Sequence, residues 1–330
     1  MDGFRIPVGE WADAGVDWIR DNLGWLLSAI ATAVGWLVDS LADLLLNAPI
    51  AVVIVVLAAF AWLLRSWQFA VGTVVTFTLI LGMGQWVTSM QTLALVLIAA
   101  VIAVVIAVPL GIAAARSDRL SAGVRPVLDL MQSMPGFVYL IPAIVFFSIG
   151  VVPGVVATVI FALPPGVRLT ELGIRGVDAE TVEAGHAFGA TPGQILRGVQ
   201  LPLAMPSIMT GVNQLIMLAL SMAVIAGIAG ADGLGKEIVQ AMSTVNIAKG
   251  VEAGLSVVIL AVYLDRLTAA LGDLRGQRWS LLGVLARRRA ANAGQPRGTD
   301  ARPTPDADAR TDSEREKESG RRAPIATGGI

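Results

Sequence analysis

The sequence predicts an all-α membrane protein that crosses the bilayer about seven times, and three observations lead to this fold class. The 330 residues are 55% apolar, with a mean hydropathy of +0.72, which lies outside the range of soluble domains. Only 15% of the residues are charged, and many of these follow Arg287. The segment Leu93–Ala115 contains 23 consecutive residues without a charge or an amide. As a helix it would be roughly 34 Å long, enough to cross the hydrocarbon core.

Further apolar segments of sufficient length give a transmembrane domain over residues 49–275. We expect all of the spans to be helical, because only a helix satisfies its own backbone in lipid. The predicted spans are 49–64, 69–88, 93–115, 127–149, 151–166, 206–230 and 252–272.

The first 48 residues can be interpreted in two ways. The stretch 22–38 is apolar enough for an eighth span, but aspartates flank it on both sides. Tryptophan, which favours the membrane interface, recurs at Trp11, Trp18, Trp25 and Trp36. We therefore expect one or two amphipathic helices lying on the membrane surface across residues 1–48.

Residues 276–330 form a charged tail that is disordered by composition, because Arg, Asp, Glu, Pro, Gly and Ala dominate and apolar periodicity stops. A solvated tail without a dedicated partner is the simpler interpretation. The basic run 287–289 leaves contact with anionic lipid headgroups open.

Composition also excludes several function classes. The chain has no cysteine and one histidine, His186, so thiol chemistry, thiolate zinc sites and a metal or catalytic cluster are not expected. The net charge of −1 gives no support for binding nucleic acid. No charged residue lies at the centre of a predicted span, which disfavours a proton-coupled carrier, and no nucleophile–base pair is available within the spans for an embedded enzyme.

The loop over residues 167–205 has the sequence signals of an ordered helix–turn–helix. Asp178 is a good N-cap, and Gly189 suits the left-handed residue that ends a helix. Thr191 caps a second short helix with Pro192 at its first position. We expect Pro202 and Pro206 to close this element before the next span.

This loop resembles the EAA signature of ABC importer permeases. The pattern is Glu183-Ala184-Gly185, three residues, Gly189, nine residues, then Val199, one residue and Leu201-Pro202. Gly185 replaces the second alanine and Val199 the more usual isoleucine. The resemblance implies that Glu183, Ala184, Gly185, Gly189, Leu201 and Pro202 couple the protein to a separate ATPase.

Longer motifs extend the likeness over residues 49–275. These are Gln132-Ser-Met-Pro-Gly-Phe-Val-Tyr-Leu-Ile-Pro142, Phe161-Ala-Leu-Pro-Pro-Gly-Val-Arg-Leu-Thr170 and Gly211-Val-Asn-Gln-Leu-Ile-Met-Leu-Ala-Leu-Ser-Met222. They resemble the permease subunit of bacterial glycine betaine/proline osmoprotectant ABC importers. The resemblance implies a type I importer fold, a second permease copy, an ABC ATPase that binds ATP and Mg, and an extracytoplasmic substrate-binding protein. The chain itself would bind no cofactor and catalyse no reaction. Proline, choline or carnitine remain alternative cargoes, and a secondary carrier remains an alternative from another class.

The positive-inside rule supplies an orientation in the plasma (inner) membrane. With seven spans and the Glu183 loop inside, four of the 24 Lys and Arg residues remain outside, namely Arg5, Arg20, Lys236 and Lys249. The amino terminus is then outside and the carboxyl terminus is cytoplasmic.

Polar, uncharged side chains on the sixth span are candidates for lining the translocation pathway, because a zwitterion must pass without tight binding. The candidates are Asn213, Gln214, Met217, Ser221 and Met222. Hydrogen bonding between helices is the alternative role for the polar members. On the same span, Ala219, Ala223 and Gly227 are spaced for close helix approach, within one subunit or across a dimer axis.

Overall fold

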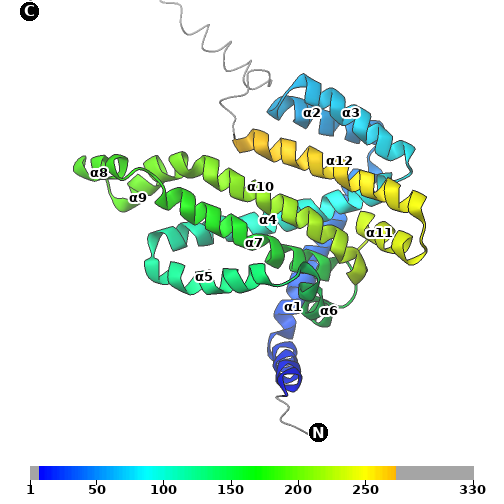
Figure 1. Cartoon of the computed structure of the whole chain (residues 1–330), viewed down its shortest axis with the longest axis horizontal. Helices are drawn as coiled ribbons and strands as arrows, with labels where there is room; N and C mark the ends of the chain where they lie inside the picture. Colours follow the sequence, from blue (N-terminus) through cyan, green and yellow to red (C-terminus); the bar gives the residue numbers. More distant parts are fainter. Residues whose placement is uncertain (1–6, 273–330) are drawn as a thin grey trace, which may run out of the picture. The chain divides into compact units, whose positions relative to one another are not determined.

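A computed structural model describes residues 7–272, and all of its regular structure is helical. Figure 1 shows the arrangement of the helices. In chain order they are α1 (Val8–Asn47), α2 (Ile50–Leu64), α3 (Trp67–Gly82), α4 (Trp86–Arg116), α5 (Asp118–Ser133), η1 (Gly136–Tyr139), α6 (Leu140–Phe147), α7 (Val151–Arg175), α8 (Ala179–Ala187), α9 (Pro192–Ile195), η2 (Leu196–Gln200), α10 (Leu201–Ala226), η3 (Gly227–Ala229), α11 (Leu234–Ser243) and α12 (Ile247–Gly272). The predicted tail over 276–330 lies outside the described residues.

Helix α7 lies at the centre of the bundle, with its most extensive contacts to α10 and α4. Glycines make the close approach possible. A Cβ on Gly173 would stand 2.7 Å from Cβ of Ser207 on α10, and one on Gly111 of α4 would stand 2.6 Å from Cβ of Thr170. Small residues at such contacts are typical of helix association in membranes, where dispersion replaces the hydrophobic effect as the driving force.

The bundle has two distinct ends. Helices α4 and α7 finish at the end that carries α8 and α9, and α10 starts there; α11 lies at the opposite end (Figure 1). Helix α12 returns toward the α8–α9 end, because its last residue, Gly272, lies against Met209 near the start of α10.

The hairpin of α2 and α3 packs against α12 through one tyrosine. The Tyr263 hydroxyl donates to the carbonyl of Leu57 at 3.1 Å, and its ring contacts the rings of Phe69 and Phe77. At 15 and 16 residues, α2 and α3 are shorter than the helices that are long enough to cross a membrane, and α3 ends at Gly82 rather than at residue 88 as predicted.

The predicted span over 127–149 is not one continuous helix. The chain is helical in α5, breaks at Met134–Pro135, and resumes in η1 and α6 after a bend of 109°. Met134 is extended (φ −86°, ψ 135°), as a residue before proline prefers. The Tyr139 hydroxyl donates to the Met131 carbonyl and so satisfies one of the acceptors that the break leaves without a partner.

Residues 8–47 form one helix, α1, which by length and composition could cross a membrane. Its packing contacts, however, lie near the first turns of α4 and α7: Gly35 faces Val152, and Asp43 shares a pocket with Gln91 and Val151. Gly35 and Asp43 are roughly 12 Å apart along α1. Their neighbours on α7, Val152 and Val151, are adjacent residues, so α1 does not run parallel to α7. Accordingly α1 runs across the bundle rather than along it (Figure 1).

Within the described residues, five helices are long and apolar enough to cross a membrane, or six with the bent pair α5–α6. They include α4, α7, α12 and the continuous run Pro192–Ala229, so the predicted spans over 93–115, 151–166, 206–230 and 252–272 are confirmed as helices. The all-α polytopic fold class is confirmed as well.

Candidate coupling site and the exposed face of helix 10

The predicted caps of the helical hairpin α8–α9 are confirmed. The Asp178 carboxylate accepts from the backbone N–H of Glu180 at 3.4 Å and caps α8. Gly189 has φ +77°, and the following N–H, of Ala190, donates to the Gly185 carbonyl at 3.1 Å. This is the Schellman arrangement, which satisfies carbonyls at the end of a helix.

Helix α9 starts with a complete capping box. The N–H of Gln194 donates to the Thr191 hydroxyl, and the Gln194 side chain accepts from the N–H of Thr191. Beyond it, the prediction that Pro202 and Pro206 end the element is wrong, because the helix continues to Ala229. The π-helical turn η2 directly precedes Pro202 and places the Leu201 N–H on the Leu196 carbonyl. This wide turn accommodates a proline ring that would otherwise clash with the carbonyl four residues earlier.

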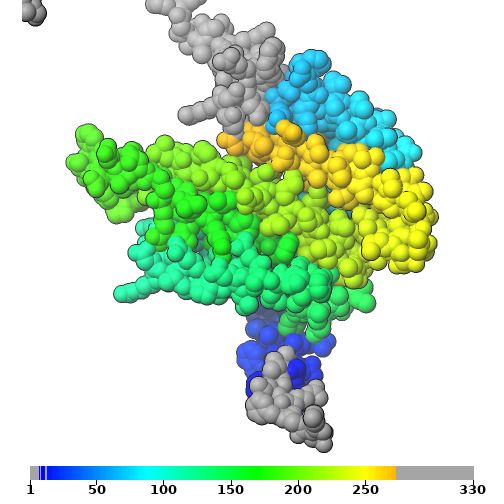
Figure 2. Space-filling model, in the orientation of Figure 1, coloured from blue at the N-terminus to red at the C-terminus, as the bar shows by residue number. Residues whose placement is uncertain are grey.

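The hairpin is held by local bonds and presents nearly all of its surface. No residue of α8 is buried, and Phe188 at its end is 91% exposed. Glu183 and Ala184 are exposed, and among residues 7–272 the Glu183 carboxylate makes no ion pair. Glu183 lies at the edge of a groove of about 590 Å³ lined in part by Arg175, Val182 and Gln200. Figure 2 shows α8 and α9 projecting at one end of the bundle.

Two of the predicted coupling residues have packing roles. A Cβ on Gly185 would stand 3.2 Å from Cγ1 of Ile195, which is 2% exposed, so glycine lets α8 rest directly on α9. Leu201 packs against a small buried cluster that joins α4, α7 and α10. The cluster contains Ile174, Leu196, Ala204 and Ile208, with Val108, Ile112 and Ala115 beside it. Pro202 is exposed on the other side of the helix.

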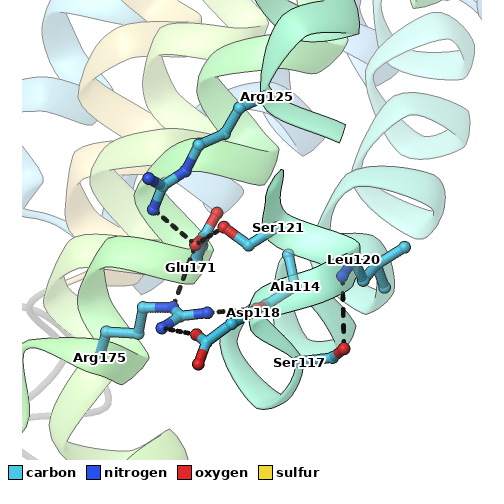
Figure 3. A network of polar contacts seen from close by, with 8 residues as sticks. All are labelled: Ala114, Ser117, Asp118, Leu120, Ser121, Arg125, Glu171 and Arg175. Atoms are coloured by element: carbon cyan, nitrogen blue, oxygen red, sulfur yellow. Dashed lines mark hydrogen bonds and ion pairs between the residues drawn. The ribbon is translucent and has the colours of Figure 1, made fainter. Parts of the chain in front are cut away.

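A charged network anchors the end of α7, shortly before the hairpin α8–α9 begins (Figure 3). The buried Glu171 carboxylate accepts from Ser121 at 2.6 Å and pairs with Arg125 at 3.1 Å and Arg175 at 3.0 Å. Arg175 also binds Asp118 at 2.7 Å and donates to the Ala114 carbonyl at 2.8 Å.

A fourth ion pair, Arg168–Asp129, joins α7 to α5 further along. The sequence analysis missed this network, because its members are far apart in sequence. The only available signal was the placement of Arg168, Glu171 and Arg175 at helical spacing.

Helix α10 separates the predicted pathway residues into two groups. Asn213 is turned toward α12, where its amide donates to Asp265 at 3.0 Å and its oxygen accepts from Thr268. Met222 is fully buried beside Tyr139 and Leu140. Gln214 and Ser221 are exposed and Met217 is half-buried. At 100° per residue these three share one stripe with exposed Thr210, so the lining prediction rests on this stripe.

At the carboxyl-terminal end of α10, small residues let the helix pack closely against α11. Gly227 lies directly against the backbone of Gly235 at the start of α11, so this part of the small-residue spacing serves packing within the subunit. The Leu234 N–H donates to the hydroxyl of Thr92 at 2.8 Å. Lys236 pairs with Asp232 at 2.7 Å, and this hydrogen bond holds the pKa of the lysine above its ordinary value.

Apolar helices of membrane-crossing length, together with an exposed, capped hairpin at one end, are the features of a polytopic membrane protein with an ordered loop between its spans. The chain belongs to the family of binding-protein-dependent transport system inner membrane components, whose model matches residues 107–275. It is therefore a multi-pass inner-membrane permease subunit of the ABC transporter class.

Curated relatives resemble most of the chain. It is 48% identical to the glycine betaine transport system permease protein OpuAB of Bacillus subtilis, over 80% of this chain and 94% of that protein. It is 45% identical to the glycine betaine/proline betaine permease protein ProW of Escherichia coli, over 86% of this chain and 82% of that protein. The glycine betaine/carnitine permease protein GbuB of Listeria monocytogenes is 46% identical over 80% of this chain and 95% of its own length.

Among solved structures, the inward-facing MetNI methionine ABC transporter is similar to this chain. It aligns with a TM-score of 0.51 over 56% of this chain and 92% of the matched chain, at 24% identity. This likeness supports the type I importer fold predicted from sequence.

Proposed function

We propose that the chain is the permease subunit of an ATP-driven importer of glycine betaine or a related compatible solute. The observation that carries the cargo class is the identity of 45–48%, over 80% or more of this chain, to three permeases named for glycine betaine. Proline, choline and carnitine remain alternative cargoes, since GbuB is also named for carnitine.

A separate ATPase, which binds ATP and Mg, would drive the cycle by holding the hairpin α8–α9. Glu183 supports this assignment because it is exposed and without an ion pair among residues 7–272. Gly185 and Gly189 would fix the shape of the hairpin, and Ala184 would allow close approach. Leu201 and Pro202 would pass its displacement into α10, since the helix is continuous from Pro192 to Ala229.

The exposed stripe on α10 would line the translocation pathway, with a second permease copy on the other side. The side chain of Gln214 gives the strongest support for this assignment. Its amide is exposed and has no hydrogen-bond partner in the described residues. An unpaired amide facing lipid costs several kcal/mol by order of magnitude, so Gln214 has to meet water, solute or a partner subunit. High-affinity recognition would lie on an extracytoplasmic substrate-binding protein.

We place the α8–α9 end in the cytoplasm, with the amino terminus outside and the carboxyl terminus inside. The described basic residues support this orientation: Arg65, Arg116, Arg175 and Arg197 belong to loops or helix ends on that side, whereas Lys236 and Lys249 belong to the opposite end. Such asymmetry is what the positive-inside rule requires.

Helix α1 would then lie at the outer surface of the inner membrane, in contact with lipid headgroups and acyl chains. At 100° per residue its carboxylates fall on one side and its exposed aliphatic side chains on the opposite side, with the tryptophans between them. The carboxylates are Glu10, Asp13, Asp17, Asp21, Asp39 and Asp43; the aliphatic residues are Leu26, Ile30, Leu37 and Leu44; the tryptophans, 61–70% exposed, are Trp11, Trp18, Trp25 and Trp36.

Reconstitution in vesicles tests the function. The permease is combined with its ATPase and its substrate-binding protein, and accumulation of radiolabelled glycine betaine is measured with and without ATP. We expect uptake only when all three proteins and ATP are present. Unlabelled proline, choline or carnitine is then added in excess, and whichever of them is also a cargo should reduce the uptake of labelled glycine betaine. Uptake that persists without the ATPase would instead indicate a secondary carrier.

A further inference from the structure

A groove beside α9 carries two arginines that the coupling assignment does not use. It has a volume of about 580 Å³ and is lined by Arg116, Thr191, Gly193, Gln194, Leu196 and Arg197. Arg116 is the last residue of α4, and Arg197 lies in the π-helical turn. The groove therefore lies where a helix of the core meets the base of the hairpin.

Both arginines are exposed, and neither forms an ion pair or a side-chain hydrogen bond with any residue in the described range 7–272. Nearby arginines behave differently. Arg125, Arg168 and Arg175 each pair with a carboxylate of the chain itself. The groove therefore offers two unneutralised guanidinium groups, which are suited to bidentate binding of a carboxylate.

The other side of the hairpin has the opposite charge. Glu180 and Glu183 on α8 are exposed and likewise lack an ion pair within the described residues. The two sides adjoin, because Arg116 and Leu196 line the groove that contains Glu183 as well as the groove beside α9. The hairpin thus presents two carboxylates on α8 next to the basic groove at its base.

We propose that the groove of Arg116 and Arg197 receives a carboxylate of the ATPase subunit, while α8 faces a basic group of the same subunit. This proposal rests on the proposed function and deepens it. Because the surface carries charges of both signs, an ATPase docked in a rotated orientation would bring like charges together, and this repulsion disfavours that orientation. The basic groove therefore fixes how the ATPase is oriented on the hairpin, and does more than add attraction.

The test is charge reversal in the intact permease. The double variant Arg116→Glu/Arg197→Glu is reconstituted in nanodiscs of neutral lipid, and binding of the purified cognate ATPase subunit is titrated at low and at high ionic strength. We expect affinity to fall on the order of 100-fold at low salt, about tenfold per close pair, and the loss to shrink as salt rises. Arg119→Glu is the matched control, because Arg119 is exposed and unpaired among residues 7–272 but does not line the groove. It should change affinity less than threefold.

Each outcome decides the proposal. Unchanged affinity in the double variant, alongside weakened binding in Glu183→Ala, would overturn the basic groove and leave the coupling function intact. If the unaltered permease itself fails to bind the ATPase, both proposals fall. The melting temperatures are also compared in nanodiscs that contain phosphatidylglycerol. If the double variant binds the ATPase normally but phosphatidylglycerol stabilises only the unaltered permease, the groove is a lipid headgroup site and the proposal is wrong. An unchanged melting temperature of the double variant shows that the fold is intact.

Discussion

The α4–α7–α10 core and the α8–α9 hairpin reach a defined shape by opposite means. In the core, glycines bring helix backbones so close that an added Cβ at Gly173 would stand within 2.7 Å of a neighbouring carbon. In the hairpin no residue of α8 is buried, and shape is set by Asp178, Gly189 and the Thr191 capping box. The comparison shows how one chain can be rigid where it must hold its shape and exposed where another protein must bind.

The difference also predicts where substitutions act. Changes in the core should act on stability, because every side chain there already has neighbours at contact distance. Changes on the surface of the hairpin should leave stability almost untouched and act on coupling. Four substitutions, from the largest expected stability effect to the smallest, test this separation.

Gly173→Val should have the largest effect. The new side chain would collide with Ser207 and the carbonyl of Ala204, so α7 and α10 would have to separate. Overpacking of this kind costs about 3 kcal/mol. The measurement is the thermal midpoint of the purified permease in detergent, with the yield of folded protein from membranes.

Gly254→Val is the matched control, since Gly254 also lies inside a long apolar helix but has nothing within 4 Å of an added Cβ. It should leave the thermal midpoint nearly unchanged. Equal losses in the two variants would show that close packing does not distinguish the core from the periphery.

Arg175→Ala should have the next largest effect and lower the free energy of unfolding by about 2 kcal/mol. It removes one partner of the buried Glu171, together with the contacts of α7 to Asp118 and to the end of α4. Adding Glu171→Gln to this variant should recover part of the loss, because the neutral amide no longer needs a cation. Chemical denaturation in detergent measures both. A double variant less stable than Arg175→Ala would contradict the assignment of Arg175 as a compensating charge.

The two regions also differ in how much of their structure could be predicted from the sequence. The caps at Asp178, Gly189 and Thr191 were predictable, because each is a bond between residues close together in the chain. The Glu171 network was not, since Ser121 is 50 positions away and a helical sequence does not show which face meets which neighbour.

Prolines account for two of the errors in the predicted helix boundaries. Pro135 does break the chain, and treating 127–149 as one span underestimated it. Pro202 does not, because the π-helical turn before it absorbs the distortion. Composition cannot separate these cases, since the outcome depends on how neighbouring turns can rearrange. On α10, the polar character of the span indicated Asn213, Gln214, Met217, Ser221 and Met222 together, but the sequence could not show that Asn213 and Met222 face other helices.

Gly189→Ala should cost about 1 kcal/mol, because φ at this position is +77° and an L side chain is strained there. Gly193→Ala is the control within the same hairpin: a Cβ added at Gly193 would meet nothing within 4 Å and φ there is not positive, so alanine should be tolerated or slightly stabilising. Hydrogen exchange of residues 179–195 measures the difference. Similar exchange in both variants would mean that the left-handed residue is not what holds the turn.

Glu183→Ala should have the smallest effect on stability and a large effect on coupling. The carboxylate is exposed and pairs with nothing among residues 7–272, so its removal costs no contact, and alanine is the better helix former. The thermal midpoint should stay within about 1 °C of the unaltered protein, in keeping with the small effects of exposed substitutions. ATP-dependent uptake should be lost or should separate from ATP hydrolysis. A variant that is both stable and fully active would show that the hairpin does not use this carboxylate, whereas a destabilised variant would place Glu183 with the core residues rather than on a coupling surface.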